Sequence, residues 1–188
     1  MPSVEHAMKI TVVGAGPLGR GADKLIEKAA MAALGAKAKA SGELCVVFAS
    51  DAQVHALNKR FLSHDRQTDV ISFNYPRIRI PGGAKKIKSP AGQAARTGRP
   101  ALRGLGGGGQ KADDSFPFGD VYISLGVAKR QAKAMKHPLL REAVTLAVHG
   151  SLHLVGYDDG KPADKVRMFK RQDALVAKLL GKEEKTRR

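Results

Sequence analysis

Two histidines and an aspartate in the last quarter of the chain have the spacing of a metal site. His149 and His153 are four residues apart, so a helix would place both imidazoles on one face with their Cβ atoms about 5–6 Å apart. Gly156 allows the left-handed turn that ends many helices, and such a turn would bring Asp159 back toward the two rings. Three ligands and one open position are typical of catalytic metal sites. We therefore predict that His149, His153 and Asp159 bind one metal ion.

The residue after the first histidine limits the chemistry of this site. The spacing matches the zinc motif of the metzincin peptidases, except that Gly150 replaces the glutamate and Asp159 replaces the last ligand. That glutamate is the general base of a zinc peptidase, and glycine has no proton acceptor in its side chain. The pattern thus indicates a metal site without peptidase activity. The alternative is that His149 and His153 are core residues that share a helix face by chance.

Three ordered segments of the sequence resemble those of a known family. HGSLHLVGYDD at residues 149–159 is similar to the HGxLHLxGYDH signature of the YbeY endoribonucleases. Leu57 and Asn58 lead to TDVISF at residues 68–73, and GDVYIS follows at residues 119–124, similar to the family's TDVLSF and GDIVIS. The resemblance covers about residues 43–160, apart from an insertion.

This resemblance implies a function, a cofactor and a partner. The implied activity is metal-dependent, single-strand-specific endoribonuclease action in ribosomal RNA maturation, at the 3′ end of 16S rRNA, and in ribosome quality control. The implied cofactor is one zinc ion per chain, which would acidify a water molecule and polarise a phosphoryl oxygen. The implied partner is ribosomal RNA or a ribosomal subunit.

The chain also departs from the family pattern at three positions. Asp159 stands in place of the third histidine, Leu62 in place of an arginine, and Gln67 in place of a proline. If the missing arginine contributes to catalysis, a nearby cation must replace it. We therefore name Arg60 and Arg66 as catalytic residues in addition to His149. The alternative for both arginines is that they are solvated surface charges.

Two other functions are compatible with the same residues. The first is an RNA-binding ribosome-assembly factor whose metal site is structural and whose nuclease activity is weak or lost. The second is metal-dependent hydrolysis of another phosphoester or of an amide. The charge of the chain favours a polyanionic substrate, and Gly150 disfavours a peptidase, so we rank the second alternative last.

Composition indicates a basic protein, for which nucleic acid is the natural partner and a solvated basic surface that only keeps the protein soluble is the alternative. The 188 residues carry a formal net charge of +16, and such a charge binds phosphate backbones with release of counterions. The single cysteine, Cys45, lies in an apolar run and has no disulfide partner in the chain. No apolar run reaches the roughly 18 residues that a membrane span needs, and no signal peptide is evident. We expect a cytoplasmic protein.

The order of the expected elements predicts the fold class. The length suits one domain of about 1–180 with a charged tail at 181–188. Apolar runs predict strands at residues 7–13, 44–49, 69–73 and 119–125, and helical spacing predicts helices between and after them. The last helix begins at Pro162 and carries apolar residues at Val166, Phe169, Val176 and Leu180. We predict a single α+β domain with a mixed sheet of about four strands, and a core helix that presents the metal site.

A glycine-rich turn near the start of the chain raises the possibility of a dinucleotide site. The turn runs from Gly14 to Gly19 as GAGPLG, between the first expected strand and the first expected helix. Asp51 would be the ribose-binding acid, but it lies farther along the chain than the usual distance of about 20 residues. No second strand–helix half of that fold follows. A simple turn between strand and helix is therefore the favoured interpretation.

One segment has the composition of a flexible insertion. Residues 74–115 form a basic, glycine-rich stretch, in which residues 74–112 hold nine lysines and arginines and no acidic residue. Gly106, Gly107, Gly108 and Gly109 are consecutive. Such a stretch buries too little apolar surface to offset the entropy of ordering it, so we expect disorder and a role in contacting polyanions.

Overall fold

A four-stranded mixed sheet forms the centre of the computed structural model, which describes residues 8–39, 42–75 and 117–186. The strands are β1 (Met8–Val13), β2 (Gly42–Ala49), β3 (Val70–Asn74) and β4 (Pro117–Ser124), in the spatial order β1-β2-β4-β3. β1, β2 and β4 run parallel, and β3 pairs antiparallel with β4 at one edge. This confirms the predicted α+β class, the mixed sheet and the pairing of the strands on either side of the insertion.

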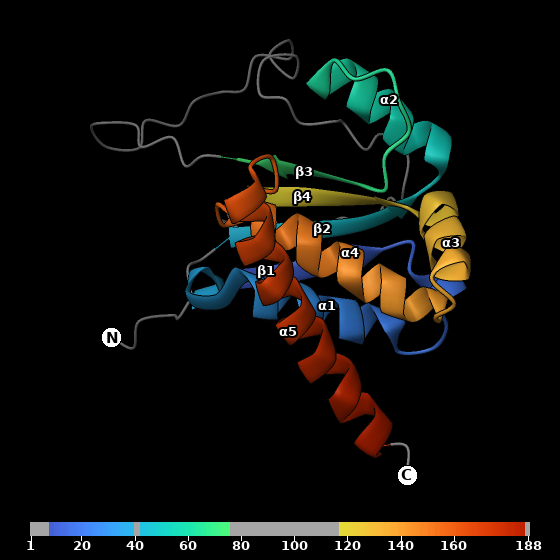
Figure 1. The fold of residues 1–188 in the computed structure, drawn as a ribbon, viewed down its shortest axis with the longest axis vertical. Coiled ribbons are helices and arrows are strands. Elements are labelled where there is room, and N and C mark those ends of the chain that lie inside the picture. Colours follow the sequence, from blue (N-terminus) through green and yellow to red (C-terminus); the bar gives the residue numbers. More distant parts are fainter. Residues whose placement is uncertain (1–7, 40–41, 76–116, 187–188) are drawn as a thin grey trace, which may run out of the picture.

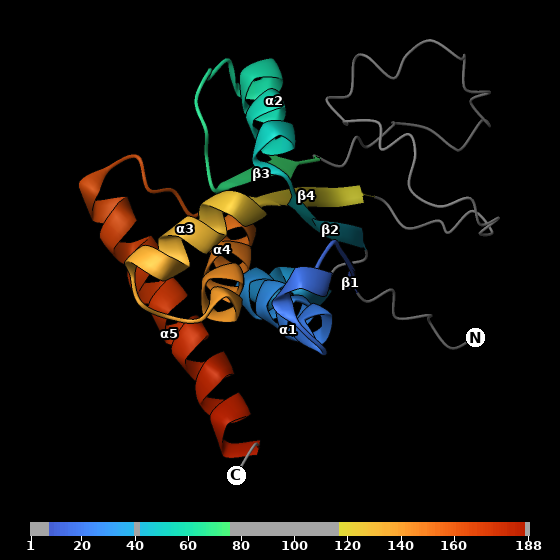
Figure 2. The same ribbon diagram turned by 90° about the vertical axis from the view of Figure 1, so that its right-hand side faces the viewer.

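Helices cover both faces of this sheet. They are α1 (Ala22–Leu34), α2 (Asp51–Leu62), α3 (Leu125–Ala134), α4 (Leu139–Leu154) and α5 (Pro162–Thr186), with short 3-10 turns at Gly16–Leu18 and Gly35–Lys39. α1 and α4 pack on one face and α5 lies against them, whereas α2 lies on the opposite face (Figures 1 and 2). No helix within the described residues is long and apolar enough to cross a membrane.

The central strand β2 is apolar on both faces because both are covered. Leu44, Val46 and Phe48 belong to the larger core shared with α1 and α4, whereas Val47 belongs to a smaller core that packs with Val54 of α2. Successive side chains of a strand point to opposite faces, so the near-continuous run LCVVF serves two cores at once.

α4 is the core helix that the sequence predicted, and two glycines allow it to lie close to the sheet. A Cβ atom on Gly150 would lie 2.5 Å from Val121 Cγ1 and 2.9 Å from Val70 Cγ2. One on Gly119 of β4 would lie 3.1 Å from a methyl carbon of Leu154. A hydrogen bond of 2.9 Å from Ser72 Oγ to the carbonyl of Gly150 fixes the helix against β3. The backbone of α4 is thus held at the edge of the sheet where β3 begins.

The buried face of α5 agrees with the prediction at Val176, which is 5% exposed, and at Leu180, which packs against the core, but it differs from the prediction near the start of the helix. Val166 and Phe169 are 69% and 36% exposed, and the residues that face the core are Met168, Gln172, Leu175 and Val176. The apolar spacing was misleading at the start of the helix because a polar residue, Gln172, points inward there and bonds to α4. The helix also continues past Gly181 to Thr186, where the sequence predicted a charged tail.

The glycine-rich turn and Asp51 have structural roles. Gly14 has a φ of 77°, and a Cβ atom there would overlap the carbonyl oxygen of Phe48. Asp51 accepts hydrogen bonds from the Ser124 hydroxyl, the Val127 backbone N–H at 3.2 Å and Arg130 Nη1 at 2.9 Å. The carboxylate that the dinucleotide alternative required therefore joins α2 to the start of α3.

Candidate metal centre

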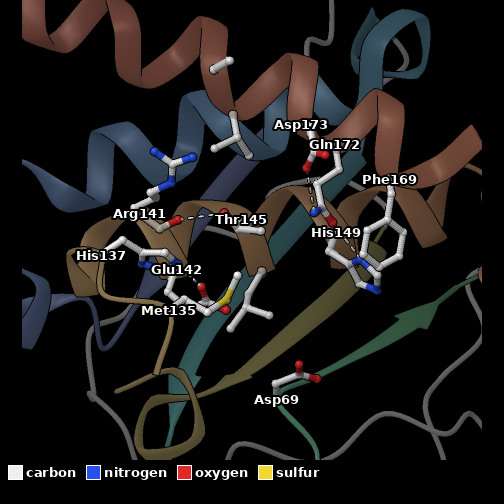
Figure 3. A pocket seen from close by; sticks show the side chains of 13 residues that line it. Asp69, Met135, His137, Arg141, Glu142, Thr145, His149, Phe169, Gln172 and Asp173 are labelled. Atoms are coloured by element: carbon white, nitrogen blue, oxygen red, sulfur yellow. Dashed lines mark hydrogen bonds and ion pairs between the residues drawn. The ribbon is translucent and has the colours of Figure 1, made fainter. Parts of the chain in front are cut away.

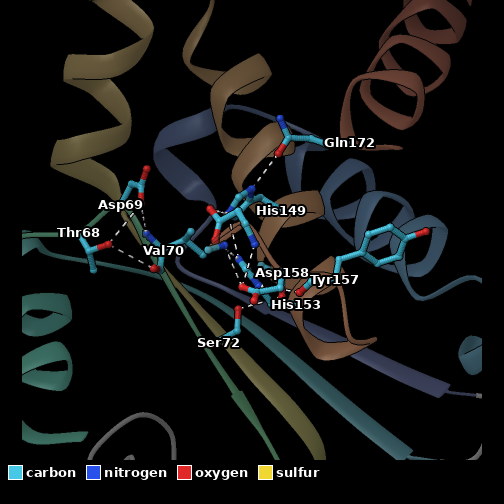
Figure 4. Close-up of polar contacts among 12 residues, drawn as sticks. Thr68, Asp69, Val70, Ser72, His149, His153, Tyr157, Asp158 and Gln172 are labelled. Carbon is cyan, nitrogen blue, oxygen red and sulfur yellow. Dashed lines mark hydrogen bonds and ion pairs between the residues drawn. The ribbon is translucent and has the colours of Figure 1, made fainter. Parts of the chain in front are cut away.

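The two histidines of α4 and the aspartate beyond it converge as the spacing predicted. His149 Nε2 and His153 Nε2 are 3.1 Å apart. Asp159 Oδ2 lies 3.8 Å from the first of these nitrogens, and Asp159 Oδ1 lies 3.9 Å from the second. Figure 4 shows the two imidazoles next to each other at the end of α4. Within the described residues, these three side chains form the group of potential metal ligands whose donor atoms lie within 4.8 Å of one another.

The turn after α4 brings the aspartate into place. Gly156 has a φ of 94°, and the backbone N–H of Tyr157 bonds to the carbonyl of Leu152 at 3.1 Å. This left-handed turn reverses the chain, as a glycine just beyond a helix commonly does. It also brings the carbonyl of Tyr157 to 3.0 Å from His153 Nδ1. One turn thus positions both an acceptor for His153 and the Asp159 carboxylate.

Partners on the far side of each ring select the tautomer that binds a metal. His149 Nδ1 lies 2.9 Å from Gln172 Oε1, and His153 Nδ1 lies 3.0 Å from the Tyr157 carbonyl. Both partners are acceptors, so each Nδ1 carries its proton and donates it. Each Nε2 then has a free lone pair and no proton. Two such nitrogens 3.1 Å apart repel each other unless a cation lies between them.

The distances fit a tetrahedral zinc site. Two ligands about 2.0–2.1 Å from a tetrahedral zinc ion lie about 3.3 Å from each other. The Nε2–Nε2 distance of 3.1 Å is close to this value, and the distances of 3.8 and 3.9 Å to the Asp159 oxygens are somewhat longer. A small movement of the Asp159 side chain, which is 39% exposed, would close that difference. The donor set and its spacing therefore suit zinc.

The surroundings keep His149 in its neutral form. Burial of the ring lowers the pKa of His149, and the bond to Gln172 and the charge of Asp159 offset part of this effect. An imidazole must be neutral to bind a metal. Because the pKa is lowered, His149 remains a competent ligand at pH values where an exposed histidine begins to take up a proton.

A cavity of about 340 Å³ lies beside the three ligands. Its walls come from the end of α2, the following loop and the start of β3. They include Asn58, Leu62, His64, Arg66, Thr68, Asp69, Ser72, His149, His153 and Asp159. Most of these side chains are polar, so the cavity suits a polar substrate group placed next to the metal ligands.

The structure separates the two arginines that the sequence named. Arg66 lines this cavity, and its carbonyl accepts a hydrogen bond of 2.8 Å from the side chain of buried Asn58, which fixes the loop. Arg60 is not among the lining residues, and its guanidinium carbon lies 5.3 Å from the ring centroid of its neighbour Phe61. Leu62, at the family's arginine position, lines the cavity with 45% of its surface exposed. Of the two arginines, Arg66 is therefore better placed to contact a group bound in this cavity.

Sequence reasoning missed several residues of the site. Gln172 was not predicted because its role depends on the packing of α5 against α4. His64, Thr68, Asp69 and Ser72 were not named as site residues, although the last three belong to the TDVISF segment. That segment was a usable signal, since it carried part of the family resemblance.

We predict that replacing Gln172 by leucine weakens metal binding. The leucine would fill a similar volume but would remove the acceptor 2.9 Å from His149 Nδ1, so the ring would lose the bond that fixes its tautomer. Loss of such an outer partner commonly costs 10- to 100-fold in metal affinity. A zinc titration with a competing chelator measures this. Arg171→Leu, next to it on the exposed side of α5 and outside the cavity wall, is the matched control and should leave the affinity unchanged.

Comparison with known proteins finds relatives that share most of this chain. The family model described as endoribonuclease YbeY matches residues 19–180. A protein of Elusimicrobium minutum named endoribonuclease YbeY is 34% identical over 155 residues, which are 82% of this chain and 87% of that protein. Another of the same name, from Pelotomaculum thermopropionicum, is 35% identical over 137 residues, or 73% of this chain and 72% of its own.

A solved structure supports the fold. The solution structure of a Thermotoga maritima protein superposes with a TM-score of 0.50 and 17% sequence identity, over 94% of this chain and 93% of that one. At this identity the likeness concerns the fold alone. The match of the family model to most of the chain and the identity to the two relatives lead to one conclusion: the chain belongs to the endoribonuclease YbeY family.

Proposed function

We propose that this protein is a zinc-dependent endoribonuclease that cuts single-stranded RNA during ribosomal RNA maturation, at the 3′ end of 16S rRNA, and contributes to ribosome quality control in the cytoplasm. The observation that carries the proposal is the convergence of His149, His153 and Asp159, with donor atoms within 4.8 Å, at the wall of a polar cavity. The family of the chain and its net charge of +16 support RNA as the substrate.

Each residue of the site has a separate role in this proposal. His149, His153 and Asp159 would hold the zinc ion, which when bound supplies a Lewis acid that activates water and polarises a phosphoryl oxygen. Gln172 and the Tyr157 carbonyl hold the two rings in the tautomer that leaves Nε2 free to bind. Arg66, in the cavity wall, is placed to bind a phosphate oxygen and to offset the negative charge of the transition state. Arg60 would act only in initial RNA binding.

An RNA-binding assembly factor with a structural metal remains the second candidate. The observation that favours it is Leu62, an apolar residue in the cavity wall at the position where the family usually has an arginine. In that case the protein would bind zinc and RNA but would cleave RNA weakly or not at all.

Metal analysis of the purified protein combined with an RNA cleavage assay tests the proposal. We expect about one zinc ion per chain and cleavage of single-stranded RNA that stops when a chelator removes the metal and returns when zinc is added. Stoichiometric zinc with RNA binding but no cleavage would establish the second candidate instead. Full activity of metal-free protein would exclude both.

We further propose that the basic segment 74–115, which lies largely outside the described residues, binds the RNA backbone. We predict that deleting residues 78–111 weakens RNA binding much more than it lowers the rate on saturating substrate. The deletion removes eight of the nine positive charges counted above. Each lost phosphate contact should reduce the salt dependence of binding by about 0.7 log units of affinity per log unit of salt.

Titrations of the deletion variant at several salt concentrations measure this effect. A second variant that keeps the length but replaces the same eight basic residues by glutamine separates charge from length. An unchanged salt slope in both variants would contradict a role in RNA binding.

A further inference from the structure

A second, larger cavity adjoins the metal centre from the other side. Its volume is about 450 Å³, and it lies between α4, α5 and the end of α3 (Figure 3). His149 and Asp69 line both this cavity and the one described above. The two cavities are therefore neighbours, and His149 belongs to the wall of each.

The wall of this cavity carries exposed apolar side chains among its polar ones. Large apolar side chains that are at least 36% exposed are few in the described residues: Leu62, Met135, Val166 and Phe169. Met135 and Phe169 line the second cavity, and Leu62 lines the first. Exposed apolar side chains that gather around a concave site indicate ligand binding.

Phe169 is placed to stack against a flat ligand beside the metal centre. Its ring centroid lies 5.9 Å from that of His149, at an interplanar angle of 76°, and the ring stands at the cavity wall in Figure 3. Nucleobases in single-stranded RNA are commonly unstacked from their neighbours and packed on aromatic rings of the protein. The YbeY fold thus offers a stacking surface next to its proposed cleavage site.

The far end of the cavity carries a buried carboxyl group. Glu142 is 5% exposed, and one of its oxygens lies 3.1 Å from His137 Nε2. Burial raises the pKa of Glu142 because it disfavours the charged carboxylate. An additional N–H donor that reached the carboxylate would stabilise the charged form. Glu142 and His149 are seven residues apart on α4, or about 10.5 Å along the helix axis. A single nucleotide covers such a span from its phosphate to the edge of its base.

We propose that the 450 Å³ cavity is a base-binding subsite, which takes the nucleobase next to the scissile phosphate, packs it against Phe169 and Met135, and receives its N–H edge at Glu142. This inference rests on the proposed endoribonuclease function and adds to it a choice of cleavage position. The metal centre acts on the backbone, which is the same in every nucleotide, so selection among positions must come from contacts to bases.

An abasic substitution in the RNA tests the subsite. Single-stranded RNAs that differ only by one abasic nucleotide, moved along the sequence, are compared by kcat/KM and by equilibrium binding. We expect one position next to the cut at which the missing base lowers kcat/KM by about 5- to 150-fold, the range of base–aromatic stacking. Phe169→Ala should cause a similar loss on intact RNA and should make the enzyme insensitive to the abasic nucleotide at that position.

Matched variants exclude an indirect effect. Phe169→Tyr retains the ring and should therefore retain the sensitivity to the abasic nucleotide that Phe169→Ala loses, and Val166→Ala on the same helix, outside the cavity wall, should show the full abasic effect. Zinc content should be unchanged in all three variants. Glu142→Gln should reduce the preference among the four bases at that position.

Independent outcomes separate this inference from the proposed function. If intact RNA is cut but no abasic position matters, or if the Phe169→Ala and abasic losses simply multiply, the base-binding subsite is wrong and the nuclease proposal stands. If RNA is bound but not cut, the affinity series decides: a single base-dependent position that Phe169→Ala abolishes would keep the subsite, although the nuclease proposal would fail.

Discussion

Replacing His149 by alanine should lower RNA cleavage by more than about 100-fold. His149 supplies one of three donor atoms, and even loss of an outer-shell partner of a metal ligand commonly costs 10- to 100-fold in affinity or activity. Loss of the ligand itself should cost more. Zinc content should fall with the activity, since Asp159 and His153 alone leave the ion with two protein ligands.

The measurement is single-turnover cleavage of one RNA at matched protein folding and matched RNA occupancy. His55→Ala is the control, because His55 lies on α2 outside both cavities and bonds to Asp65 at 2.8 Å on the surface. Loss of that exposed pair should leave both folding and activity unchanged. If His149→Ala lost its zinc but cleaved RNA like wild type, the metal would be structural and the catalytic centre would lie elsewhere.

Much of the fold was predictable because local rules and tertiary structure agree. The apolar run LCVVF predicted a strand, and β2 forms there, with a neighbouring strand on each side and helices on both faces. Ser50 and Gln53 form a capping box at the start of α2, in which both hydrogen bonds are present. In each case a few adjacent residues contain all the information that the structure uses.

The convergence of the three proposed metal ligands was predictable for a similar reason. His149 and His153 share a helix face by their spacing alone, and a single turn at Gly156 determines where Asp159 goes. The partners around them were not predictable. Gln172 reaches His149 from another helix, and a lone glutamine in an amphipathic helix normally faces solvent. That one polar contact shows why the apolar spacing of α5 gave the wrong face at its start.

The arginine in the cavity wall, for which we propose a catalytic role, was predictable only as a choice between two neighbours. Arg60 and Arg66 are close in sequence to Leu62, but the end of α2 lies between them and turns the chain. Asn58, buried on α2, bonds to the carbonyl of Arg66 and so directs the loop toward the cavity. This contact spans eight residues, and no local pattern in the sequence indicates it.

Close packing of α4 against the sheet explains why residue 150 is a glycine and not the glutamate base of a peptidase. A side chain at residue 150 points into the contact between α4 and the sheet, with Val121 Cγ1 at 2.5 Å, Val70 Cγ2 at 2.9 Å and Ser72 Oγ at 3.0 Å from the Cβ position. Valine side chains cannot move aside easily. Glutamate at this position would therefore be buried between β3 and β4 and could not reach a substrate beside the metal ligands.

We expect Gly150→Ala to lower the free energy of unfolding by about 1–3 kcal/mol, the usual cost of overpacking a core. Gly150→Glu should prevent native folding, because it adds the desolvation of a carboxylate to the same clash. Urea denaturation followed by circular dichroism measures the first effect, and metal content reports whether the helix has moved.

Gly181→Ala is the matched control for this prediction, since it makes the same change in a helix at an exposed position with no atom within 4 Å of the new Cβ. It should increase the stability by about 0.5–1 kcal/mol, because alanine loses less backbone entropy than glycine when a helix forms. The two substitutions should thus change the free energy of unfolding in opposite directions. A Gly150→Ala variant as stable as Gly181→Ala would mean that α4 does not lie this close to β3 and β4, and that packing does not explain why glycine follows the first metal-binding histidine.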